Sequence, residues 1–167
     1  PFKHKDIDKW RDSLHHGIEC RFQNTNILLH GGVDDIWIDK NTHELIVVDY
    51  KSQATDRPVD VRRYLAGWYR QAYKTQLDFY AYLLLNMGYK VSPFGYFYVC
   101  NADRSAGGFW GNLSFTETLV PYKWSCEWIE GKVWEMIAVL NSHDLPASNP
   151  SCENCAYAGQ RTSVDGG

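Results

Sequence analysis

The feature that most constrains the fold is a short apolar run that ends in charged residues. Residues 45–48 are Leu-Ile-Val-Val, a run of β-favouring side chains typical of a buried strand. Asp49, Tyr50 and Lys51 follow directly. Because side chains alternate between the two faces of a strand, we expect Asp49 and Lys51 to point the same way and Tyr50 to point the opposite way. A charged pair at the end of a buried strand is costly unless something stabilises it.

A second acidic segment precedes this strand. Residues 32–35 are Gly-Val-Asp-Asp and lead into β-favouring residues 36–38. A metal ion bound by Asp34 and Asp49 would stabilise the charged strand end, and the backbone carbonyl of Tyr50 would be a further ligand. The alternative is that all of these charges are solvated groups at turns and strand ends, because Asp-x-Lys is a common tripeptide.

A metal and a lysine at this place would support hydrolysis of a phosphodiester bond. Mg²⁺ takes oxygen ligands and usually keeps several waters. The metal lowers the pKa of such a water and neutralises charge on the phosphate oxygens. Lys51 would then orient the attacking water or stabilise the charge that develops.

The rest of the chain predicts an alternation of strands and helices. Strands are expected within residues 18–51, at 94–100 and at 112–119, and helices at 68–86 and 121–141. This order indicates an α/β domain with a central mixed β-sheet flanked by helices. The expected boundaries are a core at 1–145, either whole or truncated at its N-terminus, and an irregular cysteine-containing tail at 146–167.

Two polar features mark the helix at 68–86 and the segment before it. Gln76 and Tyr80 are four residues apart, so both can face the same site, although a polar patch on an amphipathic helix would look the same. Basic residues alternate with aromatic ones such as Trp68 and Tyr69, a combination that suits single-stranded nucleic acid but also describes a solvated helix face. The basic residues predicted to bind nucleic acid are Arg62, Arg63, Arg70 and Lys74.

Three motifs in this order resemble those of the PD-(D/E)XK nucleases of the RecB, AddB and Cas4 type. They are Gly32-Val33-Asp34, Val47-Val48-Asp49-Tyr50-Lys51-Ser52 and Gln76-Leu77-Asp78-Phe79-Tyr80. The resemblance covers about residues 18–100. It implies a restriction-endonuclease-like core and a metal-dependent DNA nuclease, either an exonuclease or an endonuclease, acting in repair, recombination or defence.

The resemblance also implies roles for individual residues. Asp34 and Asp49 would bind Mg²⁺ or Mn²⁺, and Lys51 would be the catalytic lysine. Gln76 and Tyr80 would support the site and the nucleic-acid strand. Asp35, beside the motif aspartate, would face away.

One expected part of the site has no clear counterpart in the sequence. Members of this family carry a His or Glu on an upstream helix, and His4, His15, His16 and Glu19 all lack its expected context. The alternative function is therefore a catalytically inactive nucleic-acid-binding or structural domain of a larger helicase–nuclease. The expected partners are DNA, as single strands or ends, and a helicase or other domains of a longer chain.

The cysteines and the overall charge limit the cellular location and the kinds of partner that we expect. Five scattered cysteines do not form a disulfide framework and favour a reducing, cytoplasmic location. Cys152 and Cys155 resemble part of a [4Fe–4S] motif, but Gln160 and Arg161 stand where a third cysteine is expected, so a cluster that needs four thiolates is not predicted. The net charge of −3 does not show the excess of basic residues that is typical of nucleic-acid-binding proteins, although an acidic active site can mask a local basic surface. No apolar run is long enough to span a membrane, and no signal peptide is expected.

Overall fold

The computed structural model describes residues 1–105, 107–108, 110–144 and 146–165. The chain divides into two compact units, residues 1–129 and residues 130–167. All residues of the predicted catalytic site lie in the first unit. None of the helices within the described ranges combines the length and the apolarity needed to cross a membrane.

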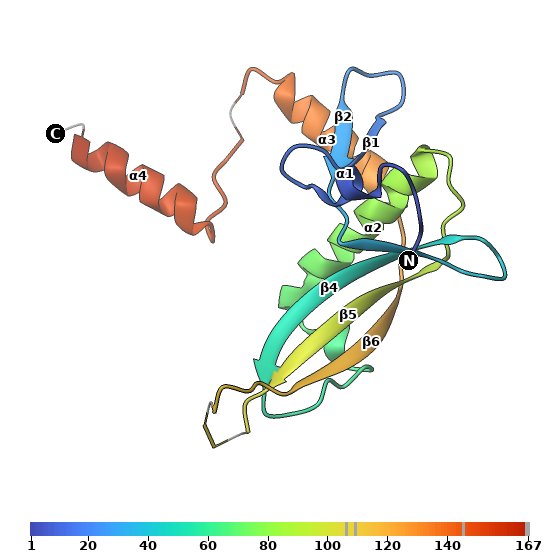
Figure 1. The fold of residues 1–167 in the computed structure, drawn as a ribbon. Coiled ribbons are helices and arrows are strands. Elements are labelled where there is room, and N and C mark those ends of the chain that lie inside the picture. Colours follow the sequence, from blue (N-terminus) through green and yellow to red (C-terminus); the bar gives the residue numbers. More distant parts are fainter. Residues whose placement is uncertain (106, 109, 145, 166–167) are drawn as a thin grey trace. The chain divides into compact units, whose positions relative to one another are not determined.

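The first unit is built on a four-stranded mixed sheet (Figure 1). Its order is β3-β4-β5-β6, with antiparallel pairing of β3 with β4 and of β5 with β6, and parallel pairing of β4 with β5. Parallel neighbours need a crossover connection, and the long helix α2 supplies it. The strands are β3 (Asp35–Ile38), β4 (Leu45–Thr55), β5 (Phe94–Asp103) and β6 (Phe115–Lys123), and α2 spans Gln71–Asn86.

A small antiparallel hairpin, β1 (Ile18–Arg21) with β2 (Leu28–Gly31), forms a separate sheet. The described elements confirm the predicted α/β class with a central mixed sheet flanked by helices. The shorter elements are α1 (Ile7–Arg11), the 3₁₀ turns η1 (Tyr64–Ala66) and η2 (Trp68–Arg70), and the helices α3 (Ile129–Leu140) and α4 (Glu153–Asp165).

Helix α2 packs its apolar side against one face of the sheet. Leu77 and Leu83 of α2 belong to the same buried cluster as Val47 of β4 and Phe97 of β5. Gly95 permits this approach, because a Cβ there would lie 2.6 Å from a Leu77 methyl and 2.9 Å from the Val47 carbonyl oxygen. The packing fixes α2 beside the strand that carries Asp49 and Lys51.

Two sequence predictions about the C-terminal part were wrong. The helix expected from Pro121 begins at Ile129, and Pro121 lies instead in β6. This strand is at the edge of the sheet, where a residue without a backbone N–H is tolerated. The tail expected to be irregular contains α4, whose sequence lacks proline and includes good helix formers. The domain boundary at residue 145 stays a prediction.

Candidate active site

Strand β4 brings Asp49 and Lys51 together on its α2-facing side. The Asp49 side chain has no exposed surface, and the Nζ atom of Lys51 lies 2.6 Å from its Oδ2 atom. Tyr50 points to the opposite face, as alternation along a strand requires, and its ring contacts Tyr98 at a centroid distance of 5.3 Å.

Asp34 reaches β4 from the segment that joins β2 to β3. Its Oδ2 atom accepts a hydrogen bond from the backbone N–H of Tyr50 at 2.7 Å. This N–H lies beyond the end of β3, whose first residue, Asp35, is paired with Val48. The Asp34 carboxylate therefore accepts the hydrogen bond that a neighbouring strand would otherwise accept. This bond holds Asp34 beside Asp49.

The electrostatic state of Asp49 is unusual for a carboxylate. Its pKa is raised to about 6: burial is the main cause, the Lys51 ammonium opposes the rise, and the charge of Asp34 adds to it. Apart from the Lys51 ammonium, neither oxygen of Asp49 has a hydrogen-bond partner among the residues that the structure describes. A buried carboxylate in this condition lacks much of the stabilisation that water or a cation would give.

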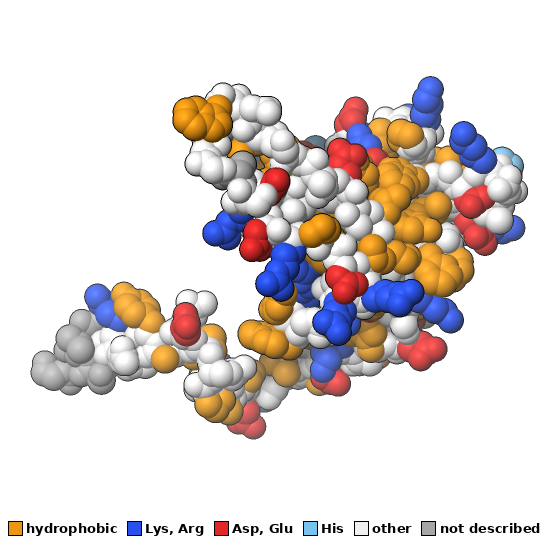
Figure 2. Space-filling model, turned by 90° about the horizontal axis from the view of Figure 1, so that it is seen from below, with side chains coloured by type: hydrophobic (Ala, Val, Ile, Leu, Met, Phe, Trp, Pro, Cys, Tyr) orange, Lys and Arg blue, Asp and Glu red, His pale blue; other side chains and the backbone are white. Residues whose placement is uncertain are grey.

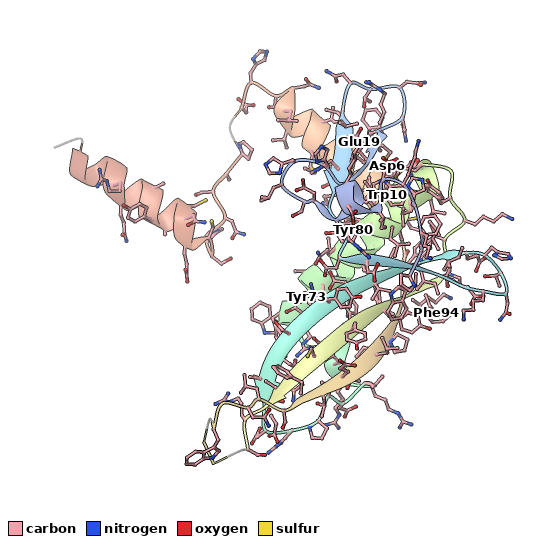
Figure 3. All side chains as sticks on the ribbon, viewed as in Figure 1. Asp6, Trp10, Glu19, Tyr73, Tyr80 and Phe94 are labelled. Atoms are coloured by element: carbon pink, nitrogen blue, oxygen red, sulfur yellow. The ribbon has the colours of Figure 1, made fainter. Side chains whose placement is uncertain are left out.

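Helix α2 supports Lys51 from the other side. The Nζ atom of Lys51 donates a hydrogen bond to Oε1 of Gln76 at 3.2 Å, and Nε2 of Gln76 donates to the Tyr80 hydroxyl at 2.9 Å. The ammonium also lies 4.4 Å from the centre of the Tyr73 ring. Figure 3 shows Tyr73 and Tyr80 along α2, beside β4. Gly31 leaves room for the Tyr80 ring, which a Cβ at that position would approach to 2.8 Å.

Asp35 is held away from this site. Its carboxylate receives hydrogen bonds from the Tyr50 hydroxyl at 2.9 Å and from Nε1 of Trp37 at 3.1 Å, and it pairs with the Arg11 guanidinium. Burial alone would raise the pKa of Asp35, but the hydrogen bonds, led by that of Arg11, lower it overall. Asp35 is therefore a partnered structural carboxylate.

The candidate upstream ligands have other contacts. His4 stacks on Trp10 at 4.4 Å, and the rings of His15 and His16 contact the Asp12 carboxylate. Glu19 is paired in register with His30 in the β1–β2 hairpin. Within the described ranges, no group of three or more His, Cys, Asp or Glu side chains is arranged to hold a metal ion.

The tail cysteines lie at the start of α4. The backbone N–H of Cys155 donates to Sγ of Cys152 at 3.4 Å, and this contact lowers the pKa of Cys152. Both thiols are free.

The predicted basic residues are not all in one place. Arg63 and Arg70 line one pocket near the end of β4, the exposed Arg62 does not line it, and Lys74 lies half-buried on α2. Figure 2 views the molecule toward this end of the sheet and shows Lys and Arg side chains gathered near the middle of that face.

Sequence reasoning missed Gln53, which links the basic pocket to the sheet. Its Oε1 atom accepts a hydrogen bond from Nη2 of Arg70 at 3.4 Å, and its Nε2 atom donates to Oδ1 of the buried Asn101 at 3.2 Å. The available signal was its place two residues after Lys51, which puts it on the same strand face.

The sequence profile of the PD-(D/E)XK nuclease superfamily matches residues 4–160. The chain belongs to this superfamily. No curated protein and no solved structure gives a significant match. Membership in the PD-(D/E)XK superfamily supports nuclease activity and a nucleic-acid substrate, and its members typically use divalent metals. All three motifs that carry the resemblance lie within the matched residues.

Proposed function

We propose that this chain is a Mg²⁺- or Mn²⁺-dependent nuclease that hydrolyses DNA phosphodiester bonds, with Asp34, Asp49 and Lys51 at its centre. The observation that carries the proposal is the condition of Asp49. Both of its oxygens are buried, the Lys51 ammonium 2.6 Å from Oδ2 does not offset the effect of burial, and Asp34 adds a second carboxylate. A divalent cation is the partner that such a carboxylate pair favours.

The proposed ligands are Asp34, Asp49 and the backbone carbonyl of Tyr50. In a strand, the N–H and C=O of one residue point to the same side. Because the N–H of Tyr50 points to Asp34, its carbonyl is directed to that side as well. A metal bound here would lower the pKa of a bound water and neutralise charge on the phosphate.

The other residues position Lys51. Oε1 of Gln76 accepts a hydrogen bond from the Lys51 ammonium, and the Tyr73 ring lies beneath the ammonium, which is favourable for a cation. Tyr80 in turn holds the amide of Gln76. We assign to Lys51 the orientation of the attacking water or the stabilisation of charge that develops on the phosphate.

The proposed substrate is DNA as single strands or ends. Arg62, Arg63, Arg70 and Lys74 would contact its backbone. Trp68 is 89% exposed beside these residues, where an aromatic side chain can stack on an unpaired base. A RecB- or Cas4-like role in cytoplasmic repair, recombination or defence, alongside a helicase or other domains, would suit this substrate.

Cleavage assays on labelled single-stranded DNA, double-stranded DNA and RNA test the proposal. Wild type should cut DNA with Mg²⁺ or Mn²⁺ and lose activity in EDTA. Asp34→Asn should reduce the rate at least about 100-fold, because a ligand to the metal is lost. The matched control is Asp8→Asn, since Asp8 is 96% exposed and outside the site. Cutting by Asp34→Asn at the wild-type rate would overturn the assignment.

A second candidate function is binding without cleavage. It is favoured by the finding that no third His, Cys, Asp or Glu joins Asp34 and Asp49 in the described part of the chain. It predicts DNA binding in EDTA and no cutting with either metal.

A further inference from the structure

The guanidinium of Arg70 is held without a full set of partners. Its Cζ atom lies 3.5 Å from the centre of the Tyr64 ring and 5.2 Å from that of Tyr69. Nη2 donates to the neutral amide of Gln53 at 3.4 Å. Nε and Nη1 are buried and have no hydrogen-bond partner among the residues described.

This arrangement suits an anion. Stacking on an aromatic ring stabilises a guanidinium, but buried donors that remain unpartnered are destabilising. The planar fork of an arginine matches the oxygens of a phosphate. Arg70 is thus prepared to bind a phosphate group through donors that the protein itself does not use.

The surrounding pocket has the composition of an anion site. It has a volume of about 410 Å³ and is lined by Arg57, Arg63 and Arg70 together with Asp56 and Asp60. Asp60 is already engaged, because its Oδ1 atom accepts the backbone N–H of Arg62 at 3.0 Å and that of Arg63 at 3.3 Å, and its Oδ2 atom lies 4.0 Å from Nε of the exposed Arg63 side chain. Arginines therefore outnumber carboxylates around the cavity.

The pocket adjoins the proposed catalytic lysine. Gln53, which holds Arg70, follows Lys51 by two residues on β4 and so lies on the same face, about 7 Å farther along the strand. We propose that this pocket binds a backbone phosphate of the substrate strand, next to the phosphate held at Lys51. The inference rests on the proposed function and assigns Arg70, with Arg63 beside it, to the strand's second phosphate.

Tyr69 is the more exposed of the two tyrosines beside the Arg70 guanidinium. Tyr64 is buried, whereas Tyr69 is 59% exposed and its ring lies against Gly67, where a Cβ would approach the ring to 2.5 Å. Because Nη1 is buried, a phosphate oxygen can reach it only after a neighbouring side chain moves, and Tyr69 is an exposed neighbour.

Affinity for single-stranded oligonucleotides, measured by fluorescence anisotropy in EDTA, tests the pocket. Each oligonucleotide carries one uncharged methylphosphonate in place of a phosphate, at successive positions. Wild type should lose affinity about tenfold at one position, as expected for loss of one charge-assisted contact. Arg70→Ala should bind the unmodified strand about tenfold more weakly. A methylphosphonate at the sensitive position should not weaken its binding further, since the substitution and the uncharged phosphonate remove the same contact.

The matched control is Arg21→Ala, which removes an exposed arginine of β1 and should reproduce the wild-type pattern. Arg70→Lys keeps the charge without the planar fork and should give an intermediate affinity. Thermal unfolding of each variant identifies any loss of folding, and Arg70→Lys decides the question if Arg70→Ala does not fold. Two results would overturn the proposal. One is wild-type affinity in both Arg70 variants. The other is an Arg70→Ala variant that loses as much affinity as wild type at every methylphosphonate position.

The affinity pattern does not depend on cleavage. A wild type that shows the pattern but cuts no DNA would contradict the nuclease and leave the phosphate pocket standing. A wild type that cuts DNA without the pattern would contradict the pocket alone.

Discussion

The Nζ atom of Lys51 lies 2.6 Å from Oδ2 of Asp49, two residues earlier on the same strand. Despite this ammonium, burial keeps the pKa of Asp49 raised to about 6. The lysine alone therefore does not compensate the buried carboxylate. This imbalance is the physical basis for proposing a metal ion, and it also predicts how the protein should respond to substitution.

Asp49→Asn should stabilise the metal-free protein. The amide has nearly the same shape but no charge to bury, so the free energy of unfolding in EDTA at neutral pH should rise by roughly 1–3 kcal/mol. Urea denaturation measures the change. The exposed Asp8→Asn control should stay within about 0.5 kcal/mol of wild type. A less stable Asp49→Asn would show that the Asp49 charge is adequately partnered without metal.

The stability contributed by Asp49 should depend on pH with a defined sign. Its pKa in the folded state is about 6 against 3.8 for the ordinary group, so the folded protein binds the proton more tightly. The free energy of unfolding should therefore fall as pH rises through this window. The difference between wild type and Asp49→Asn in EDTA isolates the effect, because other carboxylates with lowered pKa values, such as Asp35, act in the opposite direction in both proteins. A difference that does not vary with pH would contradict the raised pKa.

Gln76→Ala should impair cleavage without removing the metal site. Lys51 would lose its hydrogen-bond acceptor on α2 and its orientation, and we expect the rate to fall about tenfold while stabilisation by Mn²⁺ persists. The control is Gln71→Ala, an exposed position on the same helix. Equal cleavage rates for the two variants would show that Gln76 does not position Lys51.

Gly95→Ala should destabilise the fold. The new methyl group would lie 2.6 Å from Leu77 and 2.9 Å from the Val47 carbonyl oxygen, so α2 would have to shift, at a cost of about 1–3 kcal/mol. Gly131→Ala is the matched control: a Cβ at this helical position meets nothing within 4 Å, and alanine favours helix by up to about 1 kcal/mol. Chemical denaturation should therefore shift in opposite directions for the two variants.

Local patterns predicted correctly which side chains of the candidate site lie together, while their catalytic roles stay a prediction. Alternation along β4 placed Asp49 and Lys51 on one face, and the four-residue spacing placed Gln76 and Tyr80 together. What local patterns could not predict depends on pairing between distant segments. The expected strand ended at residue 51, but residues 52–55 continue β4 because they pair in parallel with β5.

The same reason explains the pocket around Arg70. Its organisation depends on Gln53 and Asn101, polar residues whose meeting requires the register between β4 and β5. Neither residue belongs to a motif of the superfamily resemblance. Only the folded arrangement relates them to the basic residues that the sequence had singled out.

The most direct test of the central claim is the single-turnover rate of DNA cleavage as a function of Mn²⁺ concentration in wild type, Asp49→Asn and Lys51→Ala. The account predicts a saturable, metal-dependent rate in wild type and none in Asp49→Asn. Lys51→Ala should saturate at a similar Mn²⁺ concentration with a rate lower by at least about 100-fold, because it loses a catalytic group but no metal ligand. Cleavage by Asp49→Asn within a few-fold of wild type would contradict the account.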